Sequence, residues 1–191
     1  MIAAIKNYHS SDTEIDGLVE NRYYLEQDAV ENVCETFGFK FDMDLRQSAL
    51  FTGNYQSRIT GKAHRFYTAP QYGQIFNLAY KESLKNIFTD LANLDNYPMY
   101  LHCTYGQDRT GTIIYLLYGI LNMSEEDMLL EYQRSGYHAY IYATNTMDVI
   151  NTGLEHYDGD TLQEKIVTFL TSEIGITIDQ IESIREILLE E

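Results

Sequence analysis

The spacing of apolar residues along the chain predicts alternating strands and helices. In the stretch FKFDMDL at 39–45, apolar and polar residues alternate, which is typical of a strand. Further along, apolar side chains recur every three or four positions, as at Phe76, Tyr80 and Leu84, so that they fall on one face of a helix. The whole pattern predicts strands at 39–45, 66–69 and 99–102, and helices at 25–37, about 73–94, 110–121 and most of 125–191.

This order of elements predicts an α/β fold: a central, mostly parallel sheet flanked by helices, with a helical C-terminal region. We expect residues 1–191 to form a single domain, with 1–17 as a loosely ordered lead-in. The segment 46–62, rich in Ser, Thr, Gly and Gln, is predicted to be a long loop, and loops of that length often act as lids. Three local signals are also expected to act, namely a helix stop at Gly38 and helix-starting capping boxes at Ser124 and Thr177.

Composition limits the partners of such a domain. Hydrophobic residues make up 45% of the chain, enough for a packed core, while 29 acidic and 13 basic residues give a formal net charge of −16. Nucleic acid and anionic membranes both require clustered Lys and Arg, so neither is an expected partner. The same charge argues at first against phosphorylated ligands of any kind.

The cysteines and histidines form no framework of their own. Cys34 and Cys103 lie far apart, and the five histidines have no Cys or carboxylate partners at zinc spacing, so we expect neither a disulfide scaffold nor a metal site. Cys34 shares a helical face with Val30 and Phe37, which favours a core position over a redox partnership with Cys103. No segment is typical of a signal peptide or a membrane span, so we expect a soluble, cytoplasmic protein, although a secreted one without its leader would look the same.

Residues 102–111, HCTYGQDRTG, carry the chemistry. The segment predicts a strand, a tight loop and a helix, in which the loop amides surround an anion and the positive helix end faces the same point. Gly106 permits the backbone turn, and Arg109 supplies a fork that grips two phosphate oxygens. The predicted phosphate-binding residues are Thr104, Tyr105, Gly106, Gln107, Asp108 and Arg109.

Cys103 lies at the floor of this loop and is the predicted nucleophile. Helix N-termini and nearby cations favour the thiolate form of a cysteine, which is the reactive form. Attack on a phosphate ester forms a phosphocysteine that water then hydrolyses, and no metal or cofactor is needed. Thr110 is placed to donate a hydrogen bond to the sulfur, and His102 is expected to order the loop by hydrogen bonding rather than to react.

The spacing Cys-x5-Arg-Thr resembles the signature of the protein tyrosine phosphatase superfamily. The full loop is similar to the HCxxGxDRTG loop of a bacterial branch of tyrosine and dual-specificity phosphatases, some of which also hydrolyse phosphoinositides. The stretch GFKFDMDLR at 38–46 and the turn IGIT before the last helix extend the resemblance over roughly 25–191. The resemblance implies hydrolysis of phosphotyrosine in a peptide or protein, or of a related small phosphate monoester.

The general acid that protonates the leaving oxygen has two candidates. No Asp or Glu occurs between His64 and Lys81, in the stretch before the cysteine where many family members carry the acid on a mobile loop. Asp108 lies in the signature loop itself, at a position where the resembling branch commonly has Asp. Asp44 is the alternative, because the carboxyl ends of parallel strands converge on the site, and Arg46 is expected to brace nearby loops.

Two alternatives to a phosphotyrosine phosphatase stay open. Phosphoinositide phosphatases often carry Lys where this chain has the neutral Gln107, which weakens that alternative. A silent phosphate-binding pseudophosphatase need not keep the Cys, Arg and Thr of the loop together. The net charge of −16 does not exclude a phosphorylated ligand, because about six amides, a helix end and one Arg hold a single phosphate locally.

His64 and Arg65 are either rim contacts to the substrate or solvated surface residues.

Overall fold

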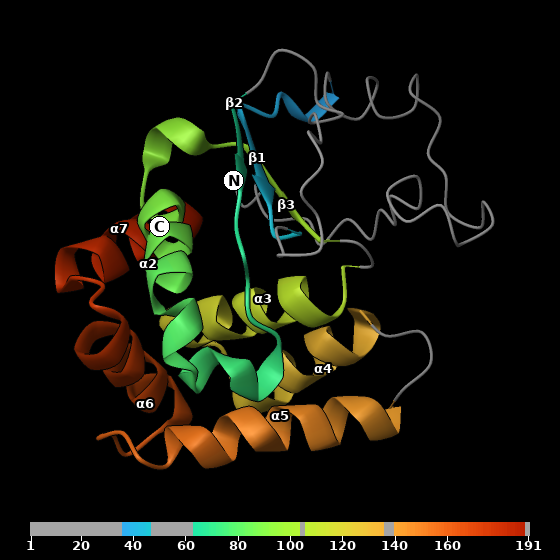
Figure 1. The fold of residues 1–191 in the computed structure, drawn as a ribbon, viewed down its shortest axis with the longest axis vertical. Coiled ribbons are helices and arrows are strands. Elements are labelled where there is room, and N and C mark those ends of the chain that lie inside the picture. Colours follow the sequence, from blue (N-terminus) through green and yellow to red (C-terminus); the bar gives the residue numbers. More distant parts are fainter. Residues whose placement is uncertain (1–35, 47–62, 104–105, 136–139, 190–191) are drawn as a thin grey trace.

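Three parallel strands form the sheet of the described part of the chain. The computed structural model describes residues 36–46, 63–103, 106–135 and 140–189. Its strands, in the spatial order β2-β1-β3 (Figure 1), are β1 (Phe41–Asp44), β2 (Ala63–Phe66) and β3 (Met99–His102). The predicted parallel sheet is confirmed, since β1 pairs in parallel with both neighbours.

The strand register brings the carboxyl ends of all three strands to one edge of the sheet. Asp44, the last residue of β1, lies opposite Phe66 and His102, the last residues of β2 and β3. Because β1 is the central strand and all four of its residues are buried, its two aspartates lie inside the protein. The chain passes from this edge directly into Cys103.

The second strand lies three residues before the predicted one, at 63–66 rather than 66–69. Its side chains alternate between exposed and half-buried positions, as expected at the edge of a sheet. Because some of these residues are polar, the pattern of apolar residues does not predict this strand. Tyr67, which belonged to the predicted strand, is buried because the chain turns into the core there, with its N–H donating to the Asp44 carbonyl at 2.8 Å.

The helix predicted over 73–94 begins later than expected. The chain forms, in order, the 3-10 turns η2 (Tyr72–Phe76) and η3 (Leu78–Tyr80), the helix α2 (Lys81–Leu91) and the 3-10 turn η4 (Leu94–Asn96). Asn77 separates the first two turns because its side-chain oxygen accepts the N–H of Ala79 at 2.9 Å. Such a local bond offers the backbone an alternative to helix continuation.

The helices predicted after the signature loop are confirmed. They are α3 (Asp108–Ile120), α4 (Glu125–Ser135), α5 (Tyr140–Leu154), α6 (Leu162–Thr168), the π-helical turn η5 (Phe169–Ile174) and α7 (Ile178–Leu188). Both predicted capping residues act: Ser124 Oγ accepts the N–H of Asp127 at 3.1 Å, and Thr177 Oγ1 accepts that of Gln180 at 3.2 Å. No helix in the described ranges has the length and apolar character needed to cross a bilayer.

Some predictions fall on residues outside the described ranges. They are the lead-in at 1–17, the loop from 47 to 62, the core position of Cys34 and most of the helix at 25–37. The end of that helix is described, and Gly38 follows it at φ +62°. This left-handed conformation is the one that glycine tolerates at a helix end, so the predicted stop is confirmed.

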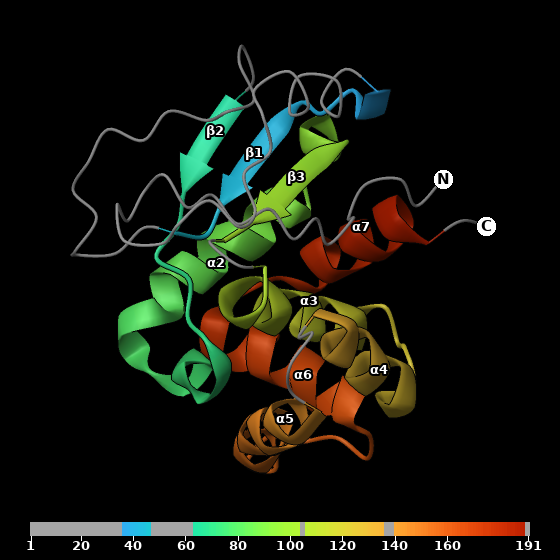
Figure 2. The same cartoon turned by 90° about the vertical axis from the view of Figure 1, so that its right-hand side faces the viewer.

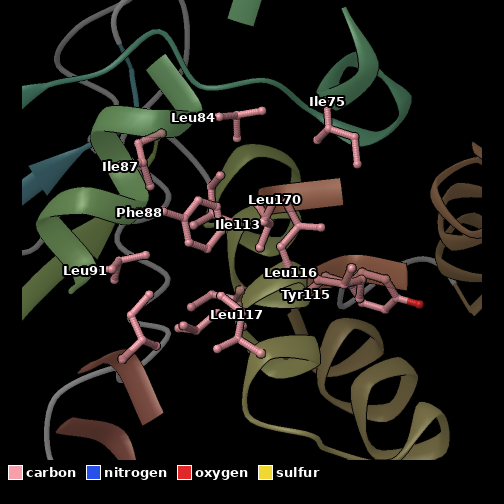
Figure 3. Packing of buried hydrophobic residues seen from close by; sticks show 14 of the residues in the cluster. Ile75, Leu84, Ile87, Phe88, Leu91, Ile113, Tyr115, Leu116, Leu117 and Leu170 are labelled. Carbon is pink, nitrogen blue, oxygen red and sulfur yellow. The ribbon is translucent and has the colours of Figure 1, made fainter. Parts of the chain in front are cut away.

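Helix α3 lies at the centre of the hydrophobic core. Ten of its 13 residues are buried. Figure 2 shows α2 and α3 next to the sheet, with α4, α5 and α6 beyond them. In Figure 3, apolar side chains of α2 face those of α3, among them Leu84, Ile87, Phe88, Ile113, Leu116 and Leu117. A helix that is packed on nearly all sides has a fixed first turn, and that turn carries the end of the signature loop.

Truncation of a buried α3 side chain tests this placement. Leu117 is fully buried, so Leu117→Ala should lower the free energy of unfolding by about 2–5 kcal/mol, because the packed helices cannot close the cavity. The matched control, Leu94→Ala, changes a residue that is 66% exposed and should shift stability by less than about 0.5 kcal/mol. Equilibrium unfolding in urea measures both variants. Equal losses would contradict the central position of α3.

Candidate active site

The signature segment forms the turn between β3 and α3. Cys103 follows β3 directly and is buried, with 4% of its surface exposed. Gly106 has φ +67°, the left-handed conformation that glycine adopts most readily. Asp108, Arg109 and Thr110 form the first turn of α3, where the backbone N–H groups and the positive end of the helix dipole favour an anion.

The predicted contacts of the loop are only partly seen. Thr104 and Tyr105 lie outside the described residues, and Gln107 is exposed just before α3. The Thr110 hydroxyl is buried but has no hydrogen-bond partner among the described residues, so the predicted bond to the Cys103 sulfur is not formed in this structure. Hydrogen bonds of this kind often close only when substrate binds, and the Thr110 hydroxyl is an unused donor until then.

A cluster of buried charged side chains adjoins the turn at the edge of the sheet. It consists of Asp42 and Asp44 from β1, His102 from β3, and Arg46. The Arg46 guanidinium binds both oxygens of Asp44, with Nε donating to Oδ1 at 2.7 Å and Nη2 to Oδ2 at 2.5 Å. His102 Nε2 lies 2.9 Å from Asp42 Oδ1, and its Nδ1 lies 3.3 Å from the Cys103 carbonyl oxygen. The cluster therefore links β1 to the first residue of the loop.

The two contacts of His102 indicate its charge. A carboxylate and a carbonyl oxygen only accept, so both ring nitrogens must carry hydrogen to satisfy both contacts, which makes His102 an imidazolium. Burial opposes that charge, but Asp42 and Asp44 outweigh it and raise the pKa of His102 above its ordinary value. Together with Arg46, the cluster then balances its positive and negative groups, as buried charges require.

Asp44 is a structural anion in this arrangement. Burial favours its neutral form, but the nearby His102, His64 and Arg46 hold the pKa of Asp44 well below its usual range. The carboxyl group is fully buried and bound on both oxygens by the guanidinium. It therefore holds no proton at neutral pH.

The two rim candidates of β2 both have partners within the protein. His64 is half-buried, and its Nε2 lies 3.4 Å from Asp44 Oδ2, so the side chain belongs to the buried charge cluster. Arg65 forms an ion pair with Asp90, which also accepts the hydroxyl of Tyr67. His64 is thus not a solvated surface residue. Arg65, whose side chain is 57% exposed, does lie at the surface, with its guanidinium paired to Asp90.

Asp108 has a partner that comes from outside the loop. The hydroxyl of Tyr72, on η2, donates to Asp108 Oδ1, and the Tyr72 backbone N–H donates to Thr112 Oγ1 at 2.9 Å. Tyr132 of α4, which adjoins Tyr72, packs so closely against α3 that a Cβ at Gly111 would lie 2.6 Å from its ring. The spacing of apolar residues cannot predict the contact between Tyr72 and Asp108, because the two residues are 36 positions apart in the sequence.

Sequence reasoning also missed Asp42, although a signal was present. Two aspartates alternate with apolar residues in a strand that the fold places at the centre of a parallel sheet, where both faces are buried. Carboxylates there must find charged partners, which predicts a buried ionic cluster. Within the described ranges, no group of His, Cys, Asp and Glu side chains is arranged to hold a metal ion.

Comparisons with known proteins agree with this geometry. Residues 19–190 match a family model described as the tyrosine phosphatase family. Among solved structures, the core catalytic domain of the PP-IP phosphatase SIW14 from S. cerevisiae, in complex with citrate, has a TM-score of 0.51 and 20% sequence identity, over 78% of this chain and 84% of that one. At this identity the likeness shows a shared fold. The comparison with curated proteins yields no match.

The raised pKa of His102 makes stability depend on pH. The stabilisation is complete below the unfolded pKa of 6.5 and is lost as the pH rises through the higher folded value. The free energy of unfolding should therefore fall above neutral pH by up to about 1.4 kcal/mol per pH unit. Asp42→Asn removes the strongest partner that favours the charge, so it should flatten this fall.

Urea unfolding between about pH 6 and about pH 9 measures the slope in both proteins. The comparison of slopes separates the ion pair from other titrating groups, because those groups are common to wild type and Asp42→Asn. Identical slopes would contradict a charged His102 held by Asp42.

Proposed function

The chain belongs to the tyrosine phosphatase family and is a cysteine-dependent phosphatase, and we propose that its substrate is phosphotyrosine or a related phosphate monoester. The observation that carries the proposal is the buried Cys103 at the end of β3, followed by a first turn of α3 that holds Asp108 and Arg109. On the HCxxGxDRTG loop alone, we also place the chain in the bacterial tyrosine and dual-specificity branch.

In the first step, the Cys103 thiolate attacks the phosphorus of the bound ester. The sulfur–phosphorus bond forms, and the bond between phosphorus and the ester oxygen breaks. Arg109 and the N–H groups at the start of α3 hold the other phosphate oxygens while negative charge develops on them. Asp108 gives its proton to the departing oxygen, so the alcohol or phenol leaves in neutral form and phosphocysteine remains.

In the second step, water attacks the phosphorus and the sulfur–phosphorus bond breaks. Asp108, now a carboxylate, takes a proton from the water and returns to its acid form. The buried Thr110 hydroxyl donates a hydrogen bond to the sulfur, which leaves as a thiolate. Inorganic phosphate is released, and both catalytic groups are restored.

The structure supports Asp108 over Asp44 as the general acid. Asp44 is buried, bound by Arg46 on both oxygens and ionised, so it has no proton to give. Asp108 is half-exposed in the same helical turn as Arg109, which binds the phosphate in this proposal. Asp44 and Arg46 then support the site as a buried ion pair.

A single phosphate fits the charge of this chain better than several. SIW14 is named for inositol pyrophosphates, and phosphoinositides likewise carry several phosphates. Gln107, exposed at the end of the loop, offers such ligands no charge, and the net charge of −16 repels them over longer distances. A lipid or inositol phosphate is therefore the second candidate substrate, and a silent phosphate-binding protein is the third possibility.

Hydrolysis of p-nitrophenyl phosphate tests the nucleophile. Wild type should turn over, and Cys103→Ser should lose roughly 10³-fold or more of kcat, because a serine hydroxyl is a far weaker nucleophile at neutral pH. The matched control is Cys34→Ser, which changes the other thiol and should keep the rate within about twofold. If wild type binds phosphotyrosine but shows no turnover, the silent phosphate-binding protein is favoured. If it releases phosphate faster from phosphoinositides than from phosphotyrosine peptides, the lipid substrate is favoured.

A series of aryl phosphates tests the general acid. Asp108→Asn should lower kcat/KM for phenyl phosphate by roughly 10²-fold or more, because phenolate is a poor leaving group without a proton. The loss on p-nitrophenyl phosphate should be much smaller, since its leaving group needs little protonation. Asp44→Asn should affect both esters alike. Full activity of Asp108→Asn on phenyl phosphate would place the acid elsewhere.

A further inference from the structure

We propose that Tyr72 is a positioning residue for the general acid: its hydroxyl holds one oxygen of Asp108 so that the other delivers the proton. The inference rests on the role proposed above for Asp108. Nothing in the signature loop requires a tyrosine at this place. Tyr72 belongs to η2, a separate turn that the fold brings to the start of α3.

The hydrogen bond between the two side chains suits a proton donor. Tyr72 donates to Asp108 Oδ1, and Oδ2 has no hydrogen-bond partner among the described residues. In the acid form, Oδ1 is then the carbonyl oxygen and Oδ2 carries the hydrogen; in the carboxylate form, Oδ1 still accepts. The same bond therefore serves both steps of the reaction, and it restricts the carboxyl group to one orientation.

The backbone of Tyr72 is also fixed to the first turn of α3. Its N–H donates to Thr112 Oγ1 at 2.9 Å, and that hydroxyl donates in turn to the Asp108 carbonyl oxygen at 2.7 Å. Tyr72 has φ +55°, a left-handed conformation that is unfavourable for a large side chain. Such a conformation persists only where surrounding contacts impose it, and here those contacts aim the phenol at Asp108.

The rest of η2 is seated firmly enough to act as a support. Ile75 is buried in the core, the Gln71 N–H donates to Gln74 Oε1 at 3.1 Å, and the Gln74 N–H donates to the Gln71 carbonyl oxygen at 3.1 Å. Gly73 lies against α5, where a Cβ would come within 2.6 Å of Val149 Cγ1. Tyr72 thus extends from a packed element, which is what precise placement of a catalytic group requires.

Tyr72 acts as a hydrogen-bond donor and not as the acid itself. Burial and the contact with Asp108 raise the pKa of its phenol, and burial raises the pKa of the adjacent Tyr132 to about 12. Both phenols therefore keep their protons at neutral pH. The charged and titratable groups that face Tyr72 are Asp108 from α3 and Tyr132 from α4.

Tyr72→Phe in the full chain tests the inference, with kcat/KM measured over aryl phosphates whose leaving groups range from p-nitrophenol to phenol. We expect a loss of roughly 10- to 100-fold for phenyl phosphate, the size of one hydrogen bond to a group that becomes charged as it loses its proton. For p-nitrophenyl phosphate the loss should stay within about twofold, because that ester needs little protonation. The double variant with Asp108→Asn should be no slower than Asp108→Asn alone.

The matched control is Tyr115→Phe, which removes a buried tyrosine hydroxyl that donates to Asn151 Oδ1 at 2.8 Å and not to Asp108. It should lower all rates equally or not at all, because it acts only through stability. If Tyr72→Phe fails to fold, Thr112→Val replaces it, since that change removes the acceptor of the Tyr72 N–H and should give the same dependence on the leaving group.

The outcomes separate the two proposals. A uniform loss, or no loss, in Tyr72→Phe across the series overturns the positioning role, and the proposed acid stands if Asp108→Asn still depends on the leaving group. If Asp108→Asn shows no such dependence, the acid assignment fails and the positioning role fails with it. A graded loss in Tyr72→Phe that Tyr115→Phe lacks supports both.

Discussion

A balanced group of buried charges at the end of the sheet sets the geometry of the active-site turn. Parallel pairing buries both faces of β1 and so carries Asp42 and Asp44 into the interior. Arg46 and the imidazolium of His102 neutralise them, and the contact from His102 to the Cys103 carbonyl transmits this constraint to the loop. Removing any one member leaves an uncompensated buried charge, so the edge of the sheet tolerates little rearrangement.

The same region resolves the conflict between a chain of net charge −16 and an anionic substrate. In the proposed site, positive potential comes locally from Arg109 and from the N-terminus of α3, while the charge of His102 is balanced within the buried cluster. Helix α3 can present its first turn with little freedom because the rest of the helix is held in the core. Under the proposed function, the acidic residues elsewhere act mainly on the choice of substrate, because they oppose ligands with many phosphates.

The loop was predictable from sequence because its chemistry is local: backbone amides, a glycine at a left-handed turn and a helix start follow one another directly, and Gly106 and α3 appear as expected. Features that depend on tertiary contacts were not predictable in this way. Strand β2 lacks apolar alternation because it lies at an edge, and Asn77 interrupts a pattern that otherwise predicts one long helix. The contact from Tyr72 to Asp108 joins residues far apart in sequence and leaves no local trace.

A structure with orthovanadate bound at Cys103 tests the central claim most directly, because five-coordinate vanadium imitates phosphorus as its bonds change. The account predicts a bond from the Cys103 sulfur to vanadium, with Arg109 and the α3 amides on the equatorial oxygens. It also predicts an apical oxygen within about 3 Å of Asp108 Oδ2 while Oδ1 stays bound to Tyr72. An apical oxygen that meets a different carboxylate, or none, would contradict the account.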